Sequence, residues 1–134
     1  MGIRIILNGI KALPRGLLRE KVIFAAVCNG KQAGGGQQLA PAAMIDDGLL
    51  DLVALTEFPP GNIPRVIQEL METEAGGDYV RRFRVPWADW DSEVEMPVNL
   101  DGEPISIKKI RFEAMPGVIK LVLPENCPVI TACS

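Results

Sequence analysis

Residues 29–52 read N-G-K-Q-A-G-G-G-Q-Q-L-A-P-A-A-M-I-D-D-G-L-L-D-L and join two apolar, strand-like runs. The first run, residues 22–27, is V-I-F-A-A-V, which suits a strand buried on both faces better than a helix. The second run covers residues 49–56. Most of the sequence between them fits neither the two-residue period of a strand nor the period of a helix. A long loop inside a compact domain is usually either functional or disordered, and its apolar flanks argue against disorder. We therefore predict that this loop carries a site.

The composition indicates a single globular domain. The chain has 134 residues, of which 48% are hydrophobic and 23% are charged, and a domain of this size buries roughly two-thirds of the surface of its unfolded chain. No apolar run approaches the roughly 18 residues of a transmembrane helix, and the first residues lack the apolar core of a signal peptide. Cys28, Cys127 and Cys133 include no C-x-x-C pair. Reduced thiols in a cytoplasmic protein are the expected arrangement.

Charge and the absence of histidine exclude several classes of function. The net charge of -3 gives no basic surface of the kind that binds nucleic acid. Because the chain contains no histidine, it can form neither a Ser-His-Asp or Cys-His centre nor a histidine-ligated metal site. We expect no nucleic-acid partner.

Hydrophobic periodicity predicts about seven short strands and one helix. Pro97 indicates an edge strand, and Asp101-Gly102 indicates a two-residue hairpin turn. The apolar phase changes near Lys108-Lys109, which indicates a bulge or a second turn there. Asp51, the single charge of its strand, is expected on the more exposed face. The predicted strands cover residues 3–7, 22–27, 49–56, 79–85, 94–100, 105–114 and 118–123.

The helix is predicted to begin after an Asn62 cap and to end at Gly76-Gly77. Its expected buried stripe consists of Ile63, Val66, Ile67, Leu70 and Met71. The predicted fold is mainly β: a two-layer antiparallel β-sandwich or open barrel with one amphipathic helix.

Several polar clusters could carry chemistry, each with a simpler structural interpretation. The Gly34–Gly36 triplet lacks the flanking residues of a phosphate loop and favours a tight turn or a close backbone approach. Asp46-Asp47-Gly48 offers hard oxygen ligands for a cation, or forms a solvated turn. The N-L-D-G-E-P hairpin at residues 99–104 could hold Glu103 rigidly as a general base, or serve only as a turn.

The basic residues could face an anionic lipid headgroup or form a solvated face. These residues are Arg81, Arg82, Arg84, Lys108, Lys109 and Arg111.

Three segments in combination resemble the bacterial YegS-like lipid kinases, which are related to the diacylglycerol and sphingosine kinases. They are the stretch at 29–52, the segment V-N-L-D-G-E-P-I-S at 98–106, and L-P-E-N-C-P at 123–128. The resemblance implies a two-domain enzyme in which an N-terminal α/β domain binds ATP and a β-rich C-terminal domain completes the cleft. This chain, residues 1–134, is similar to the second domain only. The G-G-D-G-T nucleotide motif of the family is absent from it, so we expect the chain alone to be inactive.

The resemblance also implies roles for individual residues. Glu103 corresponds to the base that accepts the proton of the lipid hydroxyl. Asp47, with the main-chain carbonyls of Met44 and Leu49, corresponds to the magnesium site. The implied cofactor is Mg²⁺, with ATP as co-substrate, and the implied partner is a lipid with a free hydroxyl, with peripheral contact at the membrane surface left open. Phosphoryl transfer fits this set, since it needs positioning and charge compensation more than covalent protein chemistry.

Two alternatives remain at this stage. The chain could be a non-catalytic β-sandwich that binds a lipid or a sugar, with Glu103 an ordinary hairpin residue. More remotely, Asp47 and Glu103 could act as the paired carboxylates of a glycosidase, which would require them to lie roughly 5 to 10 Å apart.

Overall fold

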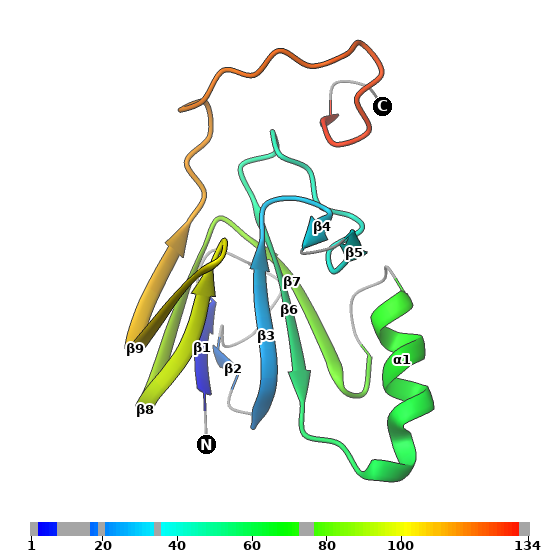
Figure 1. Ribbon diagram of the computed structural model, residues 1–134, viewed down its shortest axis with the longest axis vertical. Helices are drawn as coiled ribbons and strands as arrows, with labels where there is room; N and C mark the ends of the chain where they lie inside the picture. The colour runs from blue at the N-terminus through cyan, green and yellow to red at the C-terminus, as the bar shows by residue number, and fades with distance from the viewer. Residues whose placement is uncertain (1–2, 8–16, 19–20, 34–35, 73–76, 132–134) are drawn as a thin grey trace.

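The computed structural model describes residues 3–7, 17–18, 21–33, 36–72 and 77–131. Two antiparallel sheets form most of this part (Figure 1). The four-stranded sheet has the order β2 (Leu17–Leu18), β1 (Ile3–Leu7), β8 (Trp87–Leu100) and β9 (Glu103–Glu113). The three-stranded sheet has the order β3 (Val22–Cys28), β6 (Leu50–Thr56) and β7 (Val80–Val85). The prediction of a mainly β, sandwich-like domain is confirmed, and the described strands do not close into a barrel.

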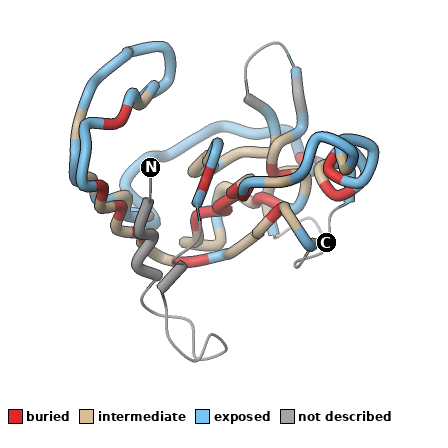
Figure 2. Tube along the Cα trace, turned by 90° about the horizontal axis from the view of Figure 1, so that it is seen from below, coloured by how far each residue is buried: buried red, intermediate tan, exposed pale blue. Residues whose placement is uncertain are grey.

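The hydrophobic core lies between the two sheets. Leu52, Ala54 and Val85 of the three-stranded sheet form one buried cluster with Trp90 and Met96 of β8. The Phe112 ring meets the Trp90 ring nearly edge-on at 6.3 Å between centroids, a favoured aromatic geometry. In Figure 2 most buried residues lie along the strands, whereas residues 115–126, after β9, are exposed.

The hairpin predicted at Asp101-Gly102 is confirmed. The backbone φ angles of Asp101 and Gly102 are 49° and 101°, and positive φ at both central residues defines the turn that matches strand twist. The Asn99 side-chain oxygen accepts a hydrogen bond from the Gly102 N–H at 2.7 Å. Pro97 pairs with Ser106 beyond the segment of β8 that contacts β1, so it occupies an edge as predicted.

Two strand predictions need correction. The predicted bulge lies on β8 between Asp91 and Met96, opposite Lys108, and not on β9 itself. Strand β3 is not buried on both faces, because it is the edge of its sheet and leaves Ile23 and Phe24 exposed.

The last predicted strand, residues 118–123, forms no strand at all. Its apolar sequence suits a strand, but no sheet edge in the described part of the chain pairs with it.

The predicted buried stripe of the helix is confirmed for Val66 and wrong for three of its residues, while Leu70 is half-buried. Helix α1 (Ile63–Met71) follows the 3-10 turn η1 (Pro60–Asn62) and buries Val66 and Glu69. Ile63, Ile67 and Met71 are exposed. Asn62 occupies the N-cap position without capping the helix through its side chain. Its amide nitrogen donates to the Tyr79 hydroxyl. The helix ends at Met71, and Gly76 of its predicted end lies outside the described residues.

A carboxylate explains this orientation of the helix. Glu69 accepts hydrogen bonds from the backbone N–H groups of Asp78, Tyr79 and Val80 at 2.8 to 2.9 Å, and from Arg65 at 3.0 Å. A Cβ at position 77 would overlap the same carboxylate, so the glycine there allows the close approach. Glu69 therefore fixes α1 to the start of β7. To make these hydrogen bonds, the helix faces the sheet with Glu69 and leaves part of the predicted apolar stripe exposed.

We predict that Glu69→Gln destabilises the domain by about 2 kcal/mol, because an amide nitrogen would face backbone donors in a buried site. The measurement is urea unfolding at pH 7. Glu72→Gln, at the exposed position directly after the same helix, is the matched control and should cost less than about 0.5 kcal/mol. Equal effects of the two substitutions would contradict the assignment.

The same carboxylate sets a pH dependence. Burial alone would raise the pKa of Glu69, but the hydrogen bonds from Tyr79, Val80, Asp78 and Arg65 outweigh it and lower the pKa from 4.5 to about 2. A lowered folded-state pKa means stability that is complete above pH 4.5 and is lost as the pH falls towards 2. Glu69→Gln should remove this part of the acid sensitivity.

Candidate functional site

The loop between β3 and β6 covers the face of the three-stranded sheet that points away from the core. Within it, β4 (Gln32–Ala33) and β5 (Gln37–Gln38) pair as a short two-stranded sheet. Gly36 has a φ of 89°, and a Cβ there would meet nothing within 4 Å. Gly36 thus serves a turn and not a close backbone approach, while Gly34 and Gly35 lie outside the described residues.

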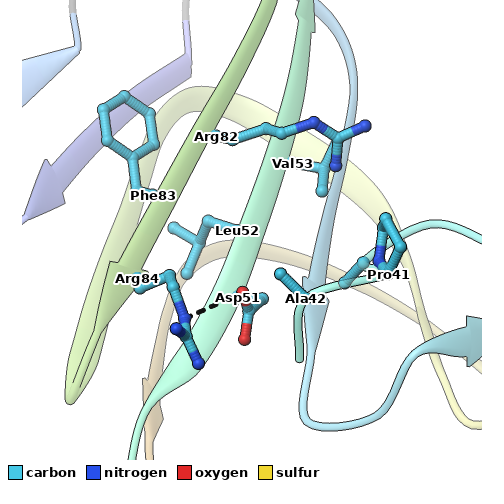
Figure 3. Close-up of a pocket in the computed structure, with 9 residues that line it drawn as sticks. Pro41, Ala42, Asp51, Leu52, Val53, Arg82, Phe83 and Arg84 are labelled. Atoms are coloured by element: carbon cyan, nitrogen blue, oxygen red, sulfur yellow. Dashed lines mark ion pairs between the residues drawn. The ribbon is translucent and has the colours of Figure 1, made fainter. Parts of the chain in front are cut away.

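Strand register brings charged residues together under this loop. Asp51 of β6 pairs with Cys28 of β3 and with Arg84 of β7, and Arg82 lies two residues from Arg84 on the same face. Ala40, Pro41 and Ala42 of the loop close a small cavity of about 90 Å³ over them. Figure 3 shows the Arg82 and Phe83 side chains leaving β7 on opposite sides, with Arg84 turned towards Asp51.

Arg84 holds the loop to the sheet. Its Nε lies 3.2 Å from Asp51 Oδ1, and its Nη2 forms an ion pair with Asp47 Oδ2. Asp47 Oδ1 also accepts a hydrogen bond from the Leu49 N–H at 2.9 Å. The chain turns between these two residues at Gly48, whose φ of 70° favours glycine.

The prediction that Asp51 lies on an exposed face is wrong. Asp51 is only 7% exposed, and its Oδ2 has no hydrogen-bond partner within the described part of the chain. Burial raises the pKa of Asp51, and the neighbouring Arg84 opposes this shift. The carboxylate is tolerated there because a guanidinium lies beside it.

Arg82 is likewise turned inward. It donates to the Leu39 and Leu70 carbonyls at 2.9 Å each, which joins the loop and the end of α1 to β7. Burial lowers the pKa of Arg82, against the attraction of Asp51. Arg82 therefore has a structural role, and the prediction that it faces solvent or a lipid headgroup is not supported.

The adjacent carboxylates Asp46 and Asp47 have different partners. Asp46 accepts hydrogen bonds from the Thr131 backbone N–H at 2.8 Å and from the Thr131 hydroxyl at 2.7 Å. It thus fixes the end of the described chain, while Asp47 fixes the loop to β7. Met44, Asp47 and Leu49 lie on this one loop and are all partly exposed. No cluster of three or more Cys, Asp or Glu side chains suited to a metal occurs among the described residues.

Glu103 belongs to the other sheet. It is the first residue of β9, pairs with Leu100 across the hairpin, and is exposed. Within the described part of the chain, no hydrogen bond or ion pair engages the Glu103 carboxylate, and none joins it to Asp47. The structure thus gives one cluster around Asp47 and a separate carboxylate on a rigid hairpin.

Sequence reasoning missed the cluster in which the buried Asp51 lies beside the half-buried Arg82 and the exposed Arg84. A signal was present, since a lone Asp in one apolar strand and an R-x-R pattern in the next can form cross-strand ion pairs. Register, which decides whether they meet, is not visible in the sequence. Of the three cysteines, Cys28 and Cys127 are free thiols and Cys133 lies outside the described residues.

Comparison with known proteins assigns the chain to a class. Residues 3–123 match the family described as the YegS C-terminal NAD kinase beta sandwich-like domain. The chain therefore belongs to this family of domains.

Individual relatives agree with that class. A protein of Shewanella frigidimarina named "Probable lipid kinase YegS-like" is 43% identical over 87% of this chain and 38% of its own length. A protein of the same name from Chromohalobacter salexigens is 41% identical over 92% of this chain and 40% of its own length. The chain thus spans about two-fifths of these relatives.

Solved structures share the fold. A Bacillus anthracis str. Sterne protein provisionally named a diacylglycerol kinase gives a TM-score of 0.68 at 19% identity, over 87% of this chain and 38% of its own. A second structure from that organism, a diacylglycerol kinase, gives a TM-score of 0.61 at 15% identity, over 84% and 40%. No helix in the described part of our chain is long and apolar enough to span a membrane.

We predict that Arg84→Gln destabilises the domain by about 1 to 3 kcal/mol, because it leaves the buried Asp51 carboxylate without its cation. Adding Asp51→Asn should recover part of the loss, since the uncompensated charge is then gone. Urea unfolding of both variants measures this.

Arg111→Gln is the control, because Arg111 is a more exposed arginine that pairs with Asp89 at 3.5 Å and lies over the Trp87 ring. Its loss should cost less than about 1 kcal/mol. If Arg84→Gln with Asp51→Asn is no more stable than Arg84→Gln alone, the role given to Arg84 is contradicted.

Proposed function

We propose that this chain is the C-terminal domain of an ATP-dependent lipid kinase, which transfers the γ-phosphate of ATP to a lipid hydroxyl. The observation that carries the proposal is the family match over residues 3–123. The relatives named as lipid kinases extend well beyond the region shared with this chain. The remainder of such a kinase, an α/β domain in our proposal, would supply most of the ATP site, so this chain alone would be inactive.

Glu103 is the proposed general base. Its carboxylate is exposed and unengaged among the described residues, and the adjoining turn at Asp101-Gly102 fixes the start of β9. In this role Glu103 accepts the proton of the lipid hydroxyl while the hydroxyl oxygen attacks the γ-phosphorus and ADP leaves. A carboxylate on a rigid hairpin suits this task, because general-base catalysis depends on position before pKa.

The loop around Asp47 is the proposed magnesium site. The two described hydrogen-bond and ion-pair contacts of Asp47 use one acceptor position on each oxygen, and a carboxylate has about four. One carboxylate with the main-chain carbonyls of Met44 and Leu49 is a donor set that fits Mg²⁺, a cation that prefers oxygen ligands and retains water. When bound there, the ion would offset phosphate charge. The protein's own part is to hold Asp47 through Arg84 and Leu49.

The test uses a kinase-length chimera, in which this chain replaces the matched region of the Shewanella frigidimarina relative. We expect ATP-dependent phosphorylation of hydroxylated lipids by the chimera and none by the 134-residue chain. Glu103→Gln should lower turnover of the chimera by roughly 100-fold or more, since it removes a general base.

Glu113→Gln, at an exposed position at the far end of β9, is the control and should retain turnover. If Glu103→Gln leaves turnover unchanged, Glu103 is not the base, and a non-catalytic lipid- or sugar-binding sandwich becomes the better description.

Asp47→Asn in the chimera should raise the Mg²⁺ concentration needed for half-maximal activity by roughly tenfold or more. Substitutions around other metal sites lower metal affinity by a similar factor. A magnesium titration of the initial rate measures this. Asp91→Asn, which affects an ion pair with Lys109 on the other sheet, should leave the titration unchanged. A reduced rate with an unchanged Mg²⁺ requirement would assign Asp47 to the loop structure alone.

A further inference from the structure

Residues 115–126, here called the strap, run from the end of β9 to the last described turn without joining either sheet. Figure 1 shows them as an arc that passes beyond the ends of the strands. The strap contains the run V-I-K-L-V-L at 118–123. Exposed fractions in this run reach 76% for Ile119 and 103% for Val122.

The strap is fixed at both ends. At its start, the Ala114 N–H donates to the Pro86 carbonyl at 2.9 Å, and Pro116 lies beside Gly48. At its end, Cys127 is buried and the Ile45 N–H donates to the Val129 carbonyl at 2.9 Å. Both anchors include residues of the loop that carries Asp47. The middle of the strap is therefore held in a defined place, although no strand pairs with it.

The run at 118–123 is apolar at five of its six positions. One phase of a strand, Ile119, Leu121 and Leu123, is entirely apolar. The other phase is Val118, Lys120 and Val122, so a single lysine interrupts the pattern. Runs that are apolar on both phases are typical of parallel sheets covered by helices on both sides. Gly117, with a φ of 75°, and Pro124 bound the run as turn residues do.

The required partner must supply hydrogen bonds as well as apolar cover. A lipid surface cannot satisfy the backbone N–H and C=O groups of a single strand. A protein sheet edge can, and strand addition to an edge is a common mode of recognition. The relatives extend well beyond the two-fifths of their length that this chain spans, so a part of suitable size exists in proteins of this family.

We propose that residues 118–123 add as a strand to a sheet of the other domain of the kinase. The partner is thus a sheet edge of an α/β domain with covered faces. This inference rests on the proposed function, in which such a domain accompanies the chain. Because the strap is anchored beside Ile45 and Gly48, this contact would also fix the loop of Asp47 relative to the other domain.

Hydrogen exchange of the backbone amides at 118–123 tests the proposal. In the 134-residue chain these amides should exchange at nearly the rate of an unstructured peptide. In the kinase-length chimera they should be slowed by roughly 100-fold or more, as paired strand amides are. The unaltered Shewanella frigidimarina relative provides the reference for its own matching segment.

Leu121→Asp provides a second measurement. The Leu121 side chain is 61% exposed, so its replacement should leave the urea midpoint of the 134-residue chain unchanged. In the chimera it should abolish the protection at 118–123. Met71→Asp is the matched control, because Met71 is a 78% exposed apolar residue on α1 and its replacement should leave that protection intact.

The outcomes separate this inference from the proposed function. Protection in a chimera without kinase activity would support the docking strand and count against the kinase proposal. Unprotected amides in a folded, active chimera would overturn the docking strand alone. Concentration-dependent protection in the 134-residue chain would also overturn it, since a second copy would then be the partner.

Discussion

The guanidinium of Arg84 joins two neighbouring strands and the loop that covers them. It contacts Asp51 on the neighbouring strand and Asp47 on the covering loop, and its own strand leads directly into β8 through Pro86. An isolated carboxylate in the position of Asp51 would be costly to bury. With Arg84 beside it, the same carboxylate helps to orient the cation, which in turn holds Asp47. The proposed magnesium loop is thus positioned by an ion-pair network on the outer face of the sheet and not by the hydrophobic core.

A buried carboxylate also explains why the observed orientation of α1 differs from the one predicted from the sequence. Apolar periodicity placed Ile63, Ile67 and Met71 inward, because hydrophobic burial is usually the largest favourable contribution of a helix. Here three backbone donors at the start of β7 require an acceptor, and Glu69 supplies it. Leaving several buried N–H groups unpaired would cost more than exposing part of an apolar stripe. A period search cannot detect this, since the donors lie in a different element.

Local turn chemistry was far more predictable. Asp101-Gly102 specifies its hairpin because few residue pairs adopt positive φ at two successive positions. Strand identity followed from alternation for β7, β8 and β9, and from a continuous apolar run for β6. Register and burial of single charges were not predictable, as Asp51 shows, because they depend on which residue of the next strand lies opposite. Glu103 and Asp47 were proposed from family resemblance. The structure adds their surroundings: a free carboxylate on one sheet and an anchored one beside the other.

The run at 118–123 is a different kind of mismatch, because its sequence has a strand pattern and its surroundings lack a strand partner. The two sheets already bury a continuous core without it, so its apolar residues are not needed for the folding of the described part. Five apolar residues in a run of six favour burial but find none, and an interface is the simplest explanation. The strap leaves and re-enters the domain beside residues 45–48. A contact made along its middle would therefore act on the loop that holds Asp47, and would link the assembly of the kinase to the geometry of its proposed metal site.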